Sequence, residues 1–132
     1  MRVFVYGTLK SGYWNSRRFG DSTLIGPDSI SGYKLVEHGR GGIPYACPYE
    51  GSTIRGEVWD IGDVDTDSNS IATLRSLDSL EGHPNGYLRV PATTITGNDV
   101  HLYTMPRDRM NPDRMNDVPL NSENEHEWTS GR

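Results

Sequence analysis

Near its start the chain carries the stretch Val3-Phe4-Val5-Tyr6-Gly7-Thr8-Leu9-Lys10-Ser11-Gly12, in which an apolar run meets a polar turn. The first four of these residues are β-branched or aromatic, which predicts a strand buried on both faces. Gly7 is expected to end that strand, because glycine allows a positive φ or a close approach of a ligand to the backbone. The amides of Thr8, Leu9 and Lys10 can then face one concavity that accepts an anion or a carbonyl oxygen. An ordinary strand followed by a turn is the alternative interpretation.

Length and charge limit the classes of protein and partner. The 132 residues suffice for one domain with a modest core. With 18 acidic and 13 basic residues the net charge is −5, so we expect neither nucleic acid nor a membrane surface as a partner. The sequence has no signal-peptide core and no apolar run near the roughly 20 residues of a transmembrane helix, which predicts a cytoplasmic protein.

The middle of the chain predicts short strands joined by turns, as expected for 15 glycines and 8 prolines. Residues 22–36 favour two short strands, because turn signals stand at residues 26–28 and 31–32. Residues 53–61 and 86–95 alternate as strands do, and residues 99–104 are expected to pair with the latter in a hairpin. The glycine-rich residues 38–42 form either the rim of a pocket or a surface connection.

One helix is predicted over residues 68–81. Asp67 and Ser68 are capping residues at its start, and Gly82 with Pro84 just beyond it marks the end. Apolar side chains recur between these points at helical spacing, at Ile71, Leu74, Leu77 and Leu80. This periodicity predicts a helix that packs one face against the core.

Glu81 interrupts the apolar face of that helix. At about 100° per residue it falls between Leu74 and Leu77 on the helix circumference, so its carboxylate is expected to point inward. Burial would raise the pKa of the carboxyl group toward the range useful in acid–base catalysis. Two alternatives stay open, namely a side chain that turns outward in the last helical turn or one that pairs with Arg89.

Other reactive side chains carry weaker signals. Arg17 and Arg18 are either solvated surface or contacts for a substrate carboxylate. His83 follows the predicted helix end, and His101 lies on a strand as a surface or structurally satisfied residue. Cys47 is the only cysteine, so an internal disulfide is excluded, and we predict a small buried apolar residue there.

The first stretch and the helix end together resemble the γ-glutamylcyclotransferase-like superfamily. Residues 3–10 resemble its Y-G-[ST]-L signature, and residues 77–84 with Tyr87-Leu88-Arg89 resemble its L-D-x-[FLY]-E-G-x-P…Y-x-R segment. Gly56-Glu57-Val58-Trp59 and Asn15 resemble two further family positions between them. In its length and in the threonine at position 8, the chain resembles the short branch of the superfamily, which contains γ-glutamylaminecyclotransferase and AIG2-like proteins, more than the longer glutathione-degrading branch. Four blocks in the same order over residues 3–105 are more specific than any single motif.

The resemblance implies an α+β fold, a small mixed β-barrel with a few peripheral helices. Residues 1–105 would form this domain, and residues 106–132 would be a C-terminal tail, either docked on the barrel through Trp128 or partly disordered. The implied reaction is cyclisation of a γ-glutamyl amine or γ-glutamyl amino acid to 5-oxoproline and a free amine, without a metal or organic cofactor. Glu81 would be the catalytic acid–base, and the substrate would contact Tyr6, Gly7, Thr8, Leu9, Lys10 and Tyr87.

Two other classes of function stay open beside the enzyme. One is a non-catalytic module that binds a small metabolite or regulates through the same pocket, and the other is a structural or interaction protein on a reused barrel. The departing amine is also open, with an amino acid, a polyamine, an isopeptide lysine and an antibiotic intermediate as candidates. The sequence does not decide the oligomeric state.

Overall fold

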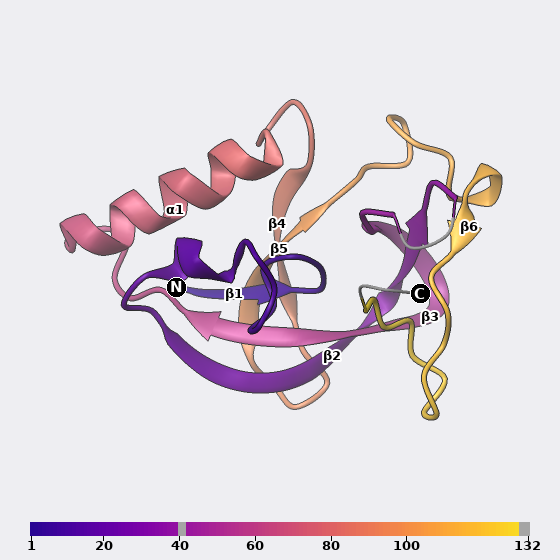
Figure 1. Ribbon diagram of the computed structural model, residues 1–132, viewed down its shortest axis with the longest axis horizontal. Coiled ribbons are helices and arrows are strands. Elements are labelled where there is room, and N and C mark those ends of the chain that lie inside the picture. The colour runs from indigo at the N-terminus through magenta and orange to yellow at the C-terminus, as the bar shows by residue number, and fades with distance from the viewer. Residues whose placement is uncertain (40–41, 130–132) are drawn as a thin grey trace.

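The computed structural model describes residues 1–39 and 42–129, which build a curved mixed sheet with one α-helix beside it (Figure 1). The six strands lie in the order β4-β5-β1-β3-β2-β6 and form a half-barrel. This architecture confirms the predicted α+β fold with a barrel-like mixed sheet. The strands are β1 (Arg2–Val5), β2 (Thr23–Glu37), β3 (Tyr45–Asp60), β4 (Leu88–Thr93), β5 (Asp99–Thr104) and β6 (Asn116–Asp117). The helices are η1 (Ser16–Phe19), α1 (Ser68–Glu81) and η2 (Pro112–Arg114), of which η1 and η2 are short 3₁₀ turns.

Strand β1 lies in the interior of the sheet and is buried on both faces, as its composition predicts. It pairs antiparallel with β3 and parallel with β5. Val3 and Val5 belong to the apolar cluster that includes Leu77 of α1, whereas Phe4 and Tyr6 belong to the cluster on the other face. The strand therefore delivers the loop that follows it to a fixed position between two packed layers.

Strands β2 and β3 are longer than the sequence predicts. The turn signals expected to divide residues 22–36 are bulges within one strand, with register shifts between Leu24 and Gly26 and between Ser31 and Tyr33. The prediction of two short strands is therefore wrong. Glycine at positive φ (139° at Gly26 and 88° at Gly32) lets a strand bulge and continue as readily as it lets a chain turn, and the long partner β3 holds it extended.

Helix α1 and the β4–β5 hairpin agree with prediction. Asp67 caps α1 by accepting a hydrogen bond from the Ser70 amide, and Gly82 ends it in the left-handed conformation. The hairpin pairs β4 with β5 in continuous antiparallel register, although β4 covers only Leu88–Thr93 of the predicted residues 86–95. Among the described residues no helix is long and apolar enough to cross a lipid bilayer.

The C-terminal segment returns to the sheet on the side away from α1 (Figure 1). Strand β6 pairs with β2, and the backbone of His126 bonds to Thr53 and Arg55 of β3. Trp128 is 2% exposed and joins the same core cluster as Phe4 and Tyr6. Up to residue 129 the tail is therefore docked. Cys47 is fully buried on β3, which confirms its predicted environment.

Candidate active site

A cavity of about 220 Å³ lies where the loop after β1 meets the end of α1 and the start of β4. Its volume is below the roughly 300–1,000 Å³ of pockets for drug-sized ligands, so it suits a ligand of about amino-acid size. Residues from several separate segments line it, namely Phe4, Val5, Tyr6, Gly7, Thr8, Leu9, Asn15, Ile43, Pro44, Tyr45, Leu80, Glu81, Tyr87 and Tyr103.

Glu81 places its carboxylate in this cavity from the last turn of α1. The side chain is mostly buried, and within residues 1–39 and 42–129 its carboxylate has no hydrogen-bond or ion-pair partner. Burial raises the pKa of this carboxyl group to about 7, against a smaller opposing effect of the Arg18 charge. Of the orientations that the sequence left open for the Glu81 side chain, the structure has the inward one. With a pKa of about 7, the carboxyl group can gain or lose a proton near neutral pH.

The alternative partner of Glu81, Arg89, is held by another residue. Arg89 Nη1 contacts both carboxylate oxygens of Asp78 at 2.6 and 2.5 Å, and the Tyr103 hydroxyl donates to Asp78 Oδ1 at 2.7 Å. Asp78 lies one turn before Glu81 on α1, whereas Arg89 and Tyr103 belong to β4 and β5. These contacts fix the end of the helix to the hairpin, and they show that Arg89 pairs with Asp78 and not with Glu81.

The loop after β1 presents backbone donors to the same cavity. A turn closed by the Lys10 amide on the Gly7 carbonyl (3.0 Å) is braced by Asn15, whose amide donates to the Thr8 carbonyl and whose Nδ2 donates to Thr8 Oγ1 (2.8 Å). In the described part of the chain the amides of Gly7, Thr8 and Leu9 have no hydrogen-bond acceptor. The sequence predicted donors at Thr8, Leu9 and Lys10, but the turn itself uses the Lys10 amide.

Asn15 braces this loop and does not cap a helix. Although it directly precedes η1, its side chain makes no capping hydrogen bond there. The bond to Thr8 uses its amide group instead, so the ability of asparagine to cap a helix is not used here. The loop is also packed from outside, because a Cβ at Gly7 would lie 3.0 Å from Pro44 Cγ.

Two tyrosines complete the polar lining. The Tyr6 hydroxyl donates to the Tyr103 carbonyl, and the Tyr87 hydroxyl donates to the Pro44 carbonyl at 3.0 Å. Burial raises the pKa of both phenols, with the nearby Glu81 charge contributing in the same direction. Because both hydroxyl protons are already donated, the two oxygens can serve a ligand only as acceptors, and the Tyr6 oxygen shares this capacity with the Ala46 amide.

Lys10 lies apart from the other predicted site residues. Its ammonium donates to the Trp128 carbonyl at 2.6 Å, and Lys10 is not among the residues that line the cavity. The structure thus places six of the seven residues predicted for the site around one cavity, namely Tyr6, Gly7, Thr8, Leu9, Glu81 and Tyr87. The sequence did not indicate the wall formed by Ile43, Pro44 and Tyr45, which reaches the cavity only through the folding of β3.

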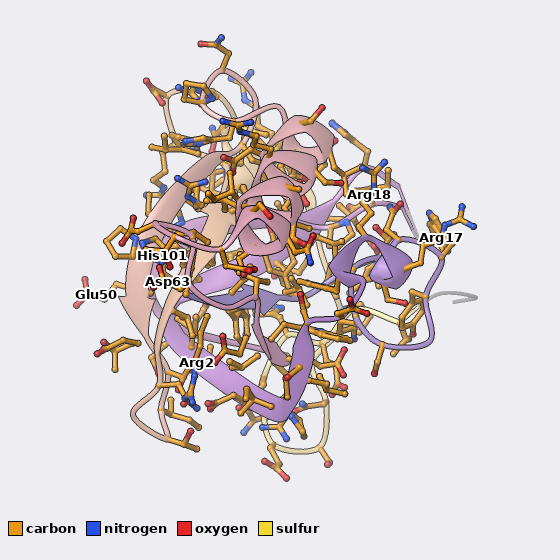
Figure 2. The ribbon with its side chains drawn as sticks, turned by 90° about the vertical axis from the view of Figure 1, so that its left-hand side faces the viewer. Arg2, Arg17, Arg18, Glu50, Asp63 and His101 are labelled. Carbon is orange, nitrogen blue, oxygen red and sulfur yellow. The ribbon has the colours of Figure 1, made fainter. Side chains whose placement is uncertain are left out.

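Residues 40 and 41 of the glycine-rich stretch proposed as a rim lie outside the described residues, whereas Ile43 and Pro44 after it do line the cavity. Figure 2 shows Arg17 at the periphery of the molecule, while Arg18 donates to Ser76 Oγ on α1 at 3.2 Å.

The two histidines considered in the sequence have other environments. His83 Nδ1 accepts the Arg89 amide at 3.0 Å. His101 lies on the other side of the view from Arg17 in Figure 2 and is absent from the cavity lining. In residues 1–39 and 42–129, no group of three or more His, Cys, Asp and Glu side chains is placed to hold a metal ion.

Comparison with known proteins gives a consistent relationship. The family model described as gamma-glutamyl cyclotransferase, AIG2-like, matches residues 3–129. The gamma-glutamylcyclotransferase family protein YtfP of Escherichia coli K12 is 35% identical over 109 residues, which is 82% of this chain and 87% of that protein.

Solved structures show the same relationship. The solution structure of Escherichia coli YtfP superposes with a TM-score of 0.63 at 30% identity, covering 97% of this chain and 96% of that one. A crystal structure of a mouse AIG2-like protein shares the fold, with a TM-score of 0.65 at 22% identity and coverage of 99% and 97%. Since the family match spans nearly the whole sequence, this chain belongs to the gamma-glutamyl cyclotransferase, AIG2-like family.

Proposed function

We propose that this protein cyclises a γ-glutamyl amine or a γ-glutamyl amino acid to 5-oxoproline and a free amine. The observation that carries the proposal is the Glu81 carboxylate, which has no partner among the described residues, lines a small cavity and has a pKa of about 7. A general base works best when its pKa lies near the operating pH. The family relationship supports the cyclotransferase class.

The proposed reaction begins with a proton transfer to Glu81. A γ-glutamyl amide carries its own nucleophile, an α-amine that is protonated in solution, and Glu81 accepts one proton from this ammonium. The amine nitrogen then attacks the γ-carbonyl carbon and closes a five-membered ring. Glu81 returns the proton to the departing nitrogen, and the original C–N bond breaks. The ring nitrogen then gives up its second proton through Glu81, so the lactam is neutral and the amine is released as an ammonium ion. One amide bond is exchanged for another, so the reaction consumes no water, reductant or oxidant.

The loop after β1 supplies the second requirement, which is stabilisation of negative charge. The amides of Gly7, Thr8 and Leu9, which have no acceptor within residues 1–39 and 42–129, belong to residues that line the same cavity as Glu81. Preorganised amides of this kind can hold the substrate carboxylate or the oxyanion that develops during ring closure. The acceptor oxygens of Tyr6 and Tyr87 suit a substrate ammonium, and the small cavity favours the bent conformer that brings amine and carbonyl together.

The test is release of 5-oxoproline from a panel of γ-glutamyl compounds whose leaving groups are a neutral alkylamine, an amino acid, the ε-amine of lysine and a polyamine. We expect release from at least one compound, and the preferred leaving group then defines the substrate class. Binding of the same panel is measured in parallel by calorimetry. Binding without release from any compound would contradict the enzyme and identify the non-catalytic module instead.

A further inference from the structure

Trp128, near the end of the described chain, bonds to two residues that adjoin separate walls of the cavity without lining it. Its indole Nε1 donates to the Gly42 carbonyl at 2.7 Å, and its own carbonyl accepts the Lys10 ammonium at 2.6 Å. Lys10 closes the turn that exposes the free amides, and Gly42 directly precedes the wall residues Ile43 and Pro44. One C-terminal residue therefore links the anion-binding loop to the wall that packs against it. We call the contacts among Lys10, Gly42 and Trp128 the Trp128 clamp.

The clamp has a firm base. The His126 amide donates to the Thr53 carbonyl and the Arg55 amide donates to the His126 carbonyl, both at 2.9 Å, so β3 fixes the backbone two residues before Trp128. The Tyr13 ring lies 5.2 Å from the Trp128 ring. Trp128 itself is almost fully buried. The indole is thus fixed by the backbone bonds of His126 to β3 and by its contact with the Tyr13 ring. A residue fixed in this way can hold the loop at Lys10 in a constant position relative to β3.

A buried lysine at position 10 is energetically unfavourable, so packing alone does not explain it. The residue is 8% exposed, and in the described residues its ammonium makes no ion pair. Its charge faces the Trp128 carbonyl and the Tyr13 ring, whose centroid lies 5.5 Å away, and the carboxylates of Glu127 and Glu57 also favour the charged form without forming an ion pair. Burial nevertheless outweighs these attractions and lowers the pKa of the Lys10 ammonium. The buried cation therefore opposes folding, and an apolar side chain of similar length would fill the same space at lower cost.

We infer that Lys10 and Trp128 are positioning residues, through which the C-terminal segment holds the loop of Gly7, Thr8 and Leu9 in register with the opposing Ile43–Pro44 wall. The inference concerns geometry within the cavity, and its kinetic consequence rests on the proposed function. A displacement of about 1 Å between catalytic groups can reduce turnover about 100-fold. Breaking the clamp should therefore slow ring closure while leaving the fold intact.

The kinetic test uses two variants with matched controls. Lys10→Met removes the ammonium and keeps the stem, and Trp128→Phe removes the indole N–H and keeps an aromatic ring. Lys34→Met also removes a buried lysine, one that pairs with Asp117 at 2.8 Å. Trp59→Phe removes an indole N–H that has no hydrogen-bond partner among the described residues. We expect the first two variants to lower kcat about 10- to 100-fold and the controls to change it less than about twofold.

A purely structural role predicts a different pattern. In that case Lys10→Met would lower the thermal unfolding midpoint and leave kcat unchanged. Positioning predicts that the midpoint stays the same or rises while kcat falls, because the variant removes the cost of a buried charge. The double variant should lose little more kcat than either single variant, since both break the same clamp. Unchanged kcat in both single variants would overturn the inference.

Amide hydrogen exchange tests the clamp independently of activity. The Tyr13 and Asn15 amides donate to the Lys10 and Thr8 carbonyls, both at 3.1 Å, and so report on the order of the loop. We expect both to exchange about tenfold faster in Lys10→Met and Trp128→Phe, while the Ile71 amide at the start of α1 keeps its rate. Unaltered exchange at residues 13 and 15 would overturn the clamp. If the wild type released no 5-oxoproline, the proposed function would fail and exchange alone would decide the clamp.

Discussion

Glu81→Gln is expected to lower kcat for 5-oxoproline release by about 10²- to 10⁴-fold, the usual contribution of a positioned acid–base group. Glutamine has nearly the same shape as glutamate but cannot accept a proton from the substrate ammonium or return one to the departing amine. KM should change little, because the loop amides and the tyrosine oxygens remain. Steady-state release of 5-oxoproline at pH 8 gives both constants.

The matched control for this variant is Glu50→Gln, which makes the same change at an exposed position of β3 (Figure 2). It should leave kcat within about twofold of the wild type, because surface charges far from a site act weakly. A Glu81→Gln protein that is folded and turns over at the wild-type rate would exclude Glu81 as the acid–base. Loss of release with retained binding of the substrate would agree with the proposed role.

The same substitution is expected to stabilise the protein at alkaline pH. In the folded protein the pKa of Glu81 is about 7, above the value of 4.5 for an unperturbed carboxyl group. Between these values the folded state binds more protons than the unfolded state, so the free energy of unfolding falls as the pH rises from about 4.5 to about 7. Above pH 7 the buried charge costs at most about 3 kcal/mol, at 1.36 kcal/mol per pKa unit.

Urea unfolding of the wild type and Glu81→Gln at pH 4.5 and pH 8 measures this cost. We expect the variant to exceed the wild type by about 2 to 3 kcal/mol at pH 8 and to match it closely at pH 4.5, where Glu81 is protonated in both states. A difference that does not depend on pH would show that the carboxylate is not destabilised by burial. Stability gained together with activity lost is the pattern expected of a catalytic residue.

Features of the fold that depend on local chemistry could be predicted from the sequence. Helix α1 begins and ends as expected, because Asp67 and Gly82 act on their own neighbours. Strand β1 was recognisable because four consecutive β-branched or aromatic residues indicate burial on both faces. The full length of β2 could not be predicted, because Gly26 and Gly32 permit either a turn or a bulge. Only pairing with the partner strand β3 decides between the two.

In the site, helical periodicity predicted the inward face of Glu81 but not which residue would hold Arg89. Asp78 binds the Arg89 guanidinium because β4 carries Arg89 to the end of α1, where the Tyr103 hydroxyl also bonds to the Asp78 carboxylate. Lys10 shows most clearly that a contact between distant residues cannot be predicted from local sequence. Its amide was predicted to belong to the anion-binding loop with those of Thr8 and Leu9. Its side chain, however, bonds to Trp128, 118 positions away, and no local pattern indicates such a contact. The Ile43–Pro44 wall depends on tertiary structure in the same way.

The pH dependence of kcat/KM for 5-oxoproline release tests the central claim, that the ionised Glu81 carboxylate starts ring closure. With a pKa of about 7 for Glu81, kcat/KM should fall tenfold per pH unit below that value. The midpoint of this limb should match the pKa of the Glu81 carboxyl group measured by NMR titration. A rate that stays constant from pH 5 to pH 8, or a midpoint that differs from the titration of Glu81 by more than about one unit, would contradict the claim.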